Sequence, residues 1–88
     1  DASALSTLFA WSGNEFADRL AGSAIRRIGY ARWLRNIAVA LGNADSSPDN
    51  LSALSARRDD PSPLVREHVL WALEQHARKP PRSALVER

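Results

Sequence analysis

The stretch Tyr30–Leu41, with the sequence YARWLRNIAVAL, decides the fold. At about 100° per residue its large apolar side chains share one face of a helix. That face carries Tyr30, Trp33, Leu34, Ile37 and Leu41. Arg32, Arg35 and Val39 fall roughly opposite, and the following Gly42-Asn43 is a helix-stop pair. The stretch therefore predicts an amphipathic helix that buries one face and exposes the other.

Three shorter helical segments are predicted on the N-terminal side of this helix. Ala4–Trp11 has apolar residues at helical spacing, and Ser12-Gly13-Asn14-Glu15 is a capping-box pattern. The helix opened by that box runs to about Leu20, where Gly22 stops it. A short helical turn, capped by Ser23, then extends through Ile28.

Two more helices are predicted on the C-terminal side. Asn50 is expected to cap one that runs to about Arg58, and Ser62-Pro63 to open another that continues to about His76. No stretch alternates apolar and polar residues with the period of a strand. The sequence therefore predicts an all-α fold of five to six helices and no sheet.

A repeat is visible inside this pattern. Leu34-Arg35-Asn36 and Val65-Arg66-Glu67 occupy the same place in two helices, and such two-helix units with a period of roughly 30–45 residues indicate a HEAT-like helical repeat. We therefore expect a right-handed solenoid fragment, with one domain over residues 1–78 and a flexible C-terminal tail over residues 79–88. Two repeats are near the minimum for a stable solenoid.

The segment Asp59–Arg66 resembles the start of the second helix of a HEAT repeat. That resemblance implies an Asp that caps the helix and an Arg that pairs with acids across the repeat. Arg66 is therefore expected to form an intramolecular ion pair or cap. Arg35 occupies the equivalent place, so the same structural role is an alternative for it.

The sequence shows no set of residues that is typical of a catalytic or metal-binding site. The 88 residues include no cysteine, which removes disulfides, thiolate metal sites and iron–sulfur ligation. His68 and His76 lie two helical turns apart, too far to chelate one metal as an i, i+4 pair does. His68 is expected at the edge of the core, and His76 near a helix C-terminus, where positive charge suits the dipole. We expect no catalytic, cofactor-binding or metal-binding residue in this chain.

Location and origin are also indicated by the sequence. No apolar run approaches the ~20 residues that span a bilayer, and no signal-peptide pattern begins the chain, so a cytoplasmic protein without a membrane partner is expected. Methionine is absent, including at position 1, so Asp1 is interpreted as a cut end of a longer protein, with N-terminal processing as the alternative.

Charge is distributed unevenly, although the formal net charge is only +2. From Arg19 to Ala44 the chain has arginines and no acid, whereas acids flank this segment on both sides. A basic block of this kind can meet phosphate groups, and the alternative is a solvated face without a partner. Trp33 and Trp71 are expected in the core, while Tyr30 has stacking on a nucleobase as an alternative role.

Four blocks of sequence carry a resemblance to a known family. They are Leu8–Phe16, Gly22–Tyr30, Trp33–Asn43 and Asp60–Leu73, and the most specific is GSAIRRIGY with the LRN and GN that follow. Together they make residues 5 to 76 resemble the C-terminal region of epoxyqueuosine reductases. The resemblance implies a parent oxidoreductase that reduces epoxyqueuosine to queuosine in tRNA. It also implies cobalamin and two [4Fe-4S] clusters, held in parts that this chain lacks.

The resemblance further implies that this region helps to shape the surface that receives tRNA. The RNA-binding candidates that match the family's polar positions are Arg26, Arg27, Arg35 and Asn36, with Arg32 as a weaker candidate. The expected partners are a tRNA anticodon stem-loop and the N-terminal catalytic domains of the same chain, in a monomer. The alternatives are a HEAT-type protein-interaction or stabilising module without a nucleic-acid partner. In these alternatives Arg26 and Arg27 are solvated or pack on the ferredoxin-like part of the parent enzyme, which this chain lacks.

Overall fold

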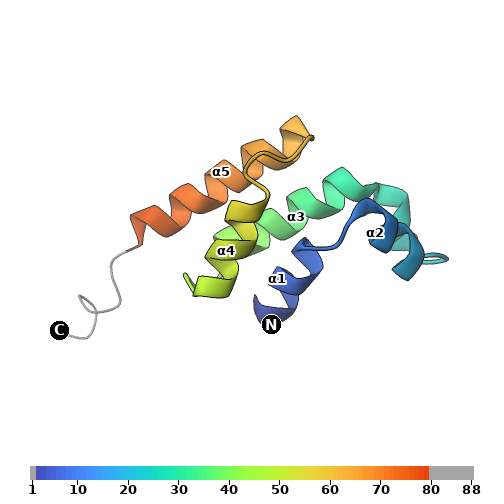
Figure 1. Ribbon diagram of the computed structural model, residues 1–88, viewed down its shortest axis with the longest axis horizontal. Coiled ribbons are helices and arrows are strands. Elements are labelled where there is room, and N and C mark those ends of the chain that lie inside the picture. The colour runs from blue at the N-terminus through green and yellow to red at the C-terminus, as the bar shows by residue number, and fades with distance from the viewer. Residues whose placement is uncertain (1, 80–88) are drawn as a thin grey trace.

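The computed structural model describes residues 2–79, and this part of the chain is entirely helical (Figure 1). The elements are α1 (Ala2–Phe9), α2 (Gly13–Arg19), the 3₁₀ helix η1 (Ala24–Ile28), α3 (Tyr30–Gly42), α4 (Pro48–Ala56) and α5 (Pro63–Arg78). No strand occurs within this range, so the all-α prediction is confirmed. The expected flexible tail lies outside the described residues, apart from Lys79, which follows the last turn of α5.

Most helix starts follow the predicted capping residues. Ser12 and Glu15 form a complete capping box at α2, because each side chain accepts a hydrogen bond from the other's backbone N–H. Ser23 caps η1 and Ser62 caps α5, again by accepting a hydrogen bond on the hydroxyl oxygen. These local signals fixed the starts correctly because each cap partner lies only two or three residues away.

The predicted start of α4 is wrong by three residues. Ser47, not Asn50, is the N-cap, and Pro48 occupies the first turn. Proline suits this position because its fixed φ is helical and its missing N–H would have no partner there. Asn50 is buried inside the helix, where its amide donates to the Asp45 carbonyl at 2.9 Å.

Helix α3 is central to the packing. It contacts α5, α1 and α4, and in Figure 1 it runs alongside α5 through the middle of the molecule. The predicted apolar face of α3 is buried: Trp33, Leu34, Ile37 and Leu41 all belong to the core, and Tyr30 packs partly buried against it. The other elements contribute Phe9, Phe16, Leu54, Val65, Val69 and Ala72.

The contact between α3 and α5 depends on a missing side chain. A Cβ on Gly42 would lie 2.5 Å from a ring carbon of Trp71 and 3.1 Å from the Cα of Ala72. Gly42 is the last residue of α3 and has no positive φ, so its role here is close helix approach. The predicted end of the helix is confirmed, but the reason for glycine is packing rather than chain reversal.

His76 lies in the last turn of α5, near the helix C-terminus as predicted, and it links the same two helices. The side chain is buried, and Nε2 lies 2.7 Å from the Leu41 carbonyl oxygen. Because a carbonyl only accepts, Nε2 carries the proton, and the Ser46 hydroxyl can donate to Nδ1 at 2.6 Å when the ring is neutral. His76 therefore links α5 to the end of α3 and to the loop that follows it.

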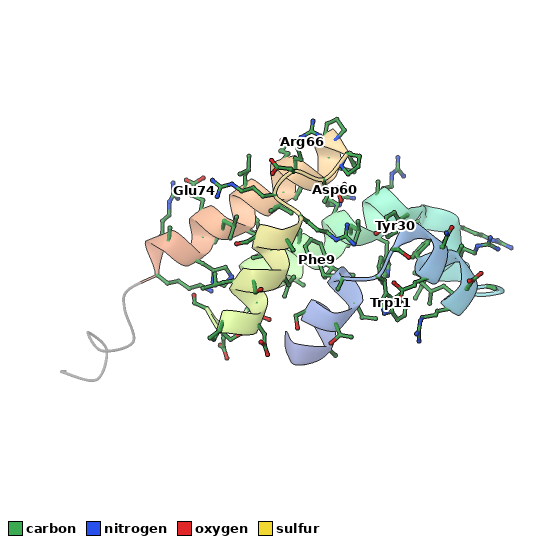
Figure 2. The ribbon with its side chains drawn as sticks, viewed as in Figure 1. Phe9, Trp11, Tyr30, Asp60, Arg66 and Glu74 are labelled. Carbon is green, nitrogen blue, oxygen red and sulfur yellow. The ribbon has the colours of Figure 1, made fainter. Side chains whose placement is uncertain are left out.

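Arg57, at the C-terminal end of α4, connects four segments of the chain. Its Nε donates to the Phe9 carbonyl, and its Nη2 donates to the Trp11 carbonyl at 2.7 Å and to the Tyr30 hydroxyl at 2.9 Å. Its Nη1 pairs with Asp60 at 2.9 Å, and both side chains are largely buried. Figure 2 labels the four residues that Arg57 contacts, namely Phe9, Trp11, Tyr30 and Asp60.

Arg66 plays an intramolecular role, but not the expected ion pair. Its Nη1 donates to the carbonyls of Asp60 and Pro61, at 2.7 and 3.2 Å. The nearby carboxylate of Asp60 is already occupied by Arg57 and by the backbone N–H of Ser62. Arg66 therefore fixes the α4–α5 loop through its backbone.

Replacing Arg57 with alanine is expected to destabilise the protein by about 2–4 kcal/mol. The change removes the cation that neutralises the largely buried Asp60 carboxylate, takes the side-chain donor from the Phe9 carbonyl, and leaves the Trp11 carbonyl with the Tyr30 hydroxyl as its remaining donor. The measurement is urea denaturation followed by circular dichroism, with the exposed neighbour Arg58→Ala as the matched control. Equal midpoints for the two variants would show that the Arg57 interactions do not stabilise the fold.

Gly42→Ala is expected to cost about 1–3 kcal/mol, because the added methyl group forces Trp71 or the α5 backbone to move. Gly13→Ala serves as control, since a Cβ there makes ordinary contact with the Tyr30 ring at 3.6 Å. Thermal unfolding of both variants gives the comparison. A Gly42→Ala protein as stable as the control would contradict the close-approach role.

Candidate nucleic-acid interface

Element η1 presents the first two candidate arginines. It lies between Gly22 and Gly29, whose φ values of 81° and 90° belong to a region that L side chains rarely adopt. Gly29 also precedes α3, and its ψ of 154° is a combination that essentially only glycine tolerates. The two glycines therefore allow the chain to leave α2, form one short helix and turn sharply into α3.

Every side chain of η1 is exposed. Arg26 and Arg27 have neither a hydrogen bond nor an ion pair from their side chains to residues 2–79. Beside them, Ile25 is 47% and Ile28 42% exposed. This element therefore offers two uncompensated cations together with apolar surface.

The remaining three candidates lie on the outward face of α3. Arg32 and Asn36 are exposed, and Arg35 is half-buried. The Nε of Arg35 donates to the Asn36 side-chain oxygen at 2.8 Å, and no acid within the described range pairs with Arg35. Within residues 2–79 Arg35 therefore shows no ion pair. On the face predicted to be exposed, Arg32 is exposed while Arg35 and Val39 are half-buried.

The structure thus gives two basic clusters in one continuous stretch of chain. Arg26 and Arg27 are adjacent on η1, while Arg32, Arg35 and Asn36 share a face of α3 at spacings of three and four residues. No Asp or Glu occurs between Leu20 and Ala44, so neither cluster is neutralised by its own segment. Such cations can bind phosphates, but they provide no acid, base or nucleophile arranged for catalysis.

Tyr30, the possible stacking residue, and Arg19, at the start of the acid-free segment, both contact other side chains of the protein. Tyr30 is half-buried, with its hydroxyl hydrogen-bonded to Trp11 and Arg57, and its ring packs beside Phe16. The alternative of base stacking by Tyr30 is therefore contradicted. The guanidinium of Arg19 lies over the Trp11 ring, 5.2 Å from its centroid, in a cation–π contact.

The sequence alone did not reveal a shallow hollow beside the second cluster. Val39 of α3 and Glu67, His68 and Trp71 of α5 line this space of about 310 Å³. Trp71 was expected in the core but is only partly buried, so part of its ring faces the hollow. On α5, Glu67 and His68 lie four and three residues before Trp71, about one helical turn away, so both are its neighbours on the helix surface. Only the packed helices show that Val39 lies opposite them.

Two further features bear on function. Within residues 2–79 no three His, Asp or Glu side chains are grouped so that they could hold a metal ion. No helix in this range is both long and apolar enough to cross a bilayer.

The chain is similar to curated epoxyqueuosine reductases over most of its length. It is 62% identical over 76 residues to the enzyme of Xanthomonas campestris and 59% identical over 76 residues to that of Pseudomonas aeruginosa, in each case covering 86% of this chain. The Escherichia coli enzyme is 56% identical over 68 residues, or 77% of the chain. The chain spans about a fifth of the length of these relatives (21%, 21% and 18%).

These matches confirm the resemblance predicted from the sequence. No family profile matches the chain, and no solved structure matches it.

Arg26→Glu combined with Arg27→Glu is expected to leave the free energy of unfolding within about 0.5 kcal/mol of the original, because neither guanidinium has an intramolecular partner. Chemical denaturation measures this directly. A loss as large as that expected for Arg57→Ala would mean that these arginines stabilise the fold, and would remove them as free phosphate ligands.

Proposed function

We propose that this chain, which belongs to the epoxyqueuosine reductase family, is the substrate-docking part of such an enzyme and faces tRNA. The parent reaction, reduction of epoxyqueuosine to queuosine in tRNA, belongs to this proposal, as does a cytoplasmic location. The supporting observation is a set of arginines that the fold exposes without compensating acids. Phosphate contacts of this kind supply much of the affinity for RNA and orient it.

We further propose that residues 1–78 form a HEAT-like domain. The contacts support this arrangement: α1 packs on α3 and α4 on α5, while α1 also meets α4 and α3 meets α5. Two helix pairs stacked in register give this pattern, with α2 and η1 as an insertion in the first pair. Consequently the arginines of η1 lie on the inserted element rather than on a repeat helix.

The parent's cobalamin and two [4Fe-4S] clusters do not fit this chain. The 88 residues contain no cysteine, so they offer no thiolate for a cluster. In our proposal those groups are bound by other parts of the enzyme, and the chemistry takes place there. This chain contributes binding and orientation of the RNA.

A protein contact on η1 is a second candidate, favoured by one observation. Ile25 and Ile28 are large, apolar and exposed, whereas the apolar residues of α3 are mostly buried. Exposed apolar side chains next to arginine are typical of protein–protein contacts, and the catalytic domains of the same enzyme would be the partner. In a monomeric parent, η1 would then lie where protein and RNA surfaces meet.

In a full-length reductase with this sequence, Arg26→Glu with Arg27→Glu is expected to weaken binding of an anticodon stem-loop several-fold. The plot of log affinity against log salt should also flatten, by about 0.7–0.9 for each phosphate that the variant no longer neutralises. Fluorescence anisotropy at several salt concentrations measures both effects.

The matched control is Arg58→Glu with Arg78→Glu, which makes the same change of charge outside the acid-free segment. If both double variants lose affinity equally, only the total charge matters and this segment is not the docking site. If neither changes RNA affinity but Ile25→Ser lowers the stability of the full-length enzyme, the protein-contact function replaces the RNA one.

A further inference from the structure

The hollow beside the α3 cluster combines an aromatic wall with hydrogen-bond acceptors. Trp71 is held in place because its ring edge lies against Gly42, where even one methyl group would collide. Glu67 and His68 line the same space from the preceding turn of α5, and Val39 closes it from α3. A space of about 310 Å³ is at the lower end of the range for small-ligand sites.

The polar groups here are unusually free to bind. The carboxylate of Glu67 has no hydrogen bond or ion pair with residues 2–79, in contrast to Glu74, which pairs with Arg78 on the same helix. His68 Nδ1 lies 2.8 Å from the Leu64 carbonyl oxygen and therefore carries the proton. Its Nε2 is consequently an acceptor when the ring is neutral, so the rim presents two acceptors.

The arginines of α3 continue along the helix face that carries Val39. Arg35 and Arg32 precede Val39 by four and seven residues, which places them about 6 and 10 Å along the helix axis on the same side. An anion would be repelled by Glu67 inside the hollow but attracted by these cations beside it. The hollow therefore suits an uncharged part of a ligand, and the arginines suit an anionic part of the same ligand.

We propose that the hollow receives one unpaired nucleobase of the bound RNA, an inference that rests on the proposed function above. The base stacks against Trp71, and its N–H groups donate to Glu67 and His68 while the flanking phosphates meet Arg35 and Arg32. A carboxylate accepts well from the adjacent ring N–H and amino group of guanine, and also from the amino groups of adenine or cytosine. Uracil, which has a single N–H between two carbonyls, is disfavoured.

The decisive variant is Glu67→Gln in the full-length reductase. Removing a negative charge near an RNA should strengthen binding or leave it unchanged if only phosphates are contacted. If Glu67 accepts from a base, the affinity for the anticodon stem-loop instead falls by roughly 5- to 100-fold. Glu74→Gln makes the same charge change on α5 outside the hollow, and should not weaken binding; Figure 2 labels this residue.

A base-by-base measurement completes the test. Single loop nucleotides of the stem-loop are replaced by abasic sites, and each RNA is titrated against the original enzyme, Trp71→Leu and Glu67→Gln. We expect one position whose removal weakens binding to the original enzyme by about 5- to 100-fold, but has little further effect in either variant. Circular dichroism confirms that each variant is folded. If Trp71→Leu is not, Trp71→Phe takes its place.

The outcomes separate the two proposals. If Arg26→Glu with Arg27→Glu weakens binding but no abasic position is coupled to Trp71 or Glu67, the nucleobase site is wrong and the docking function stands. If the arginine variant also binds normally, the docking function fails as well. A Glu67→Gln enzyme that binds RNA normally but loses stability would assign the hollow to a protein contact and overturn the inference.

Discussion

The placement of one guanidinium, that of Arg57, is the constraint on which the N-terminal half of the structure depends. It satisfies carbonyls at the end of α1, meets the hydroxyl of Tyr30 at the start of α3, and is neutralised by Asp60 beyond α4. A largely buried cation is tolerated only with such partners, because desolvation is otherwise expensive. The start of α3 is therefore tied, through the Tyr30 hydroxyl, to an ion pair between α4 and the α4–α5 connection.

Arginine has two separate uses in this small domain, and the neighbours of each side chain distinguish them. Arg57 and Arg66 donate to backbone carbonyls, so their charges serve the loops around α4 and α5. Arg26 and Arg27 have no such acceptors within residues 2–79. A planar guanidinium with several donors suits both uses, which explains why composition alone could not separate structural from ligand-facing arginines.

Features set by neighbours in the chain were predictable, and those set by distant partners were not. The period of α3 and the caps of α2 and α5 were foreseen because helical spacing and capping act over a few residues. Arg57 and His76 escaped because their acceptors lie 48 and 35 residues away. Three of the candidate arginines, Arg26, Arg27 and Arg32, are exposed and Arg35 is half-buried. The hollow could not be foreseen, because it requires knowing which face of α5 meets Val39.

The conformation of Gly29 has a consequence for how such a surface can evolve. The φ and ψ of Gly29 set the direction of η1 relative to α3 through the backbone, and the side chains of η1 are not needed for this. Gly29 thus sets the position of η1, whereas the side chains of η1 determine what the segment binds. Mutation could exchange the displayed side chains one at a time and retune what the segment recognises, while the glycine, which almost no other residue can replace, keeps the display in place.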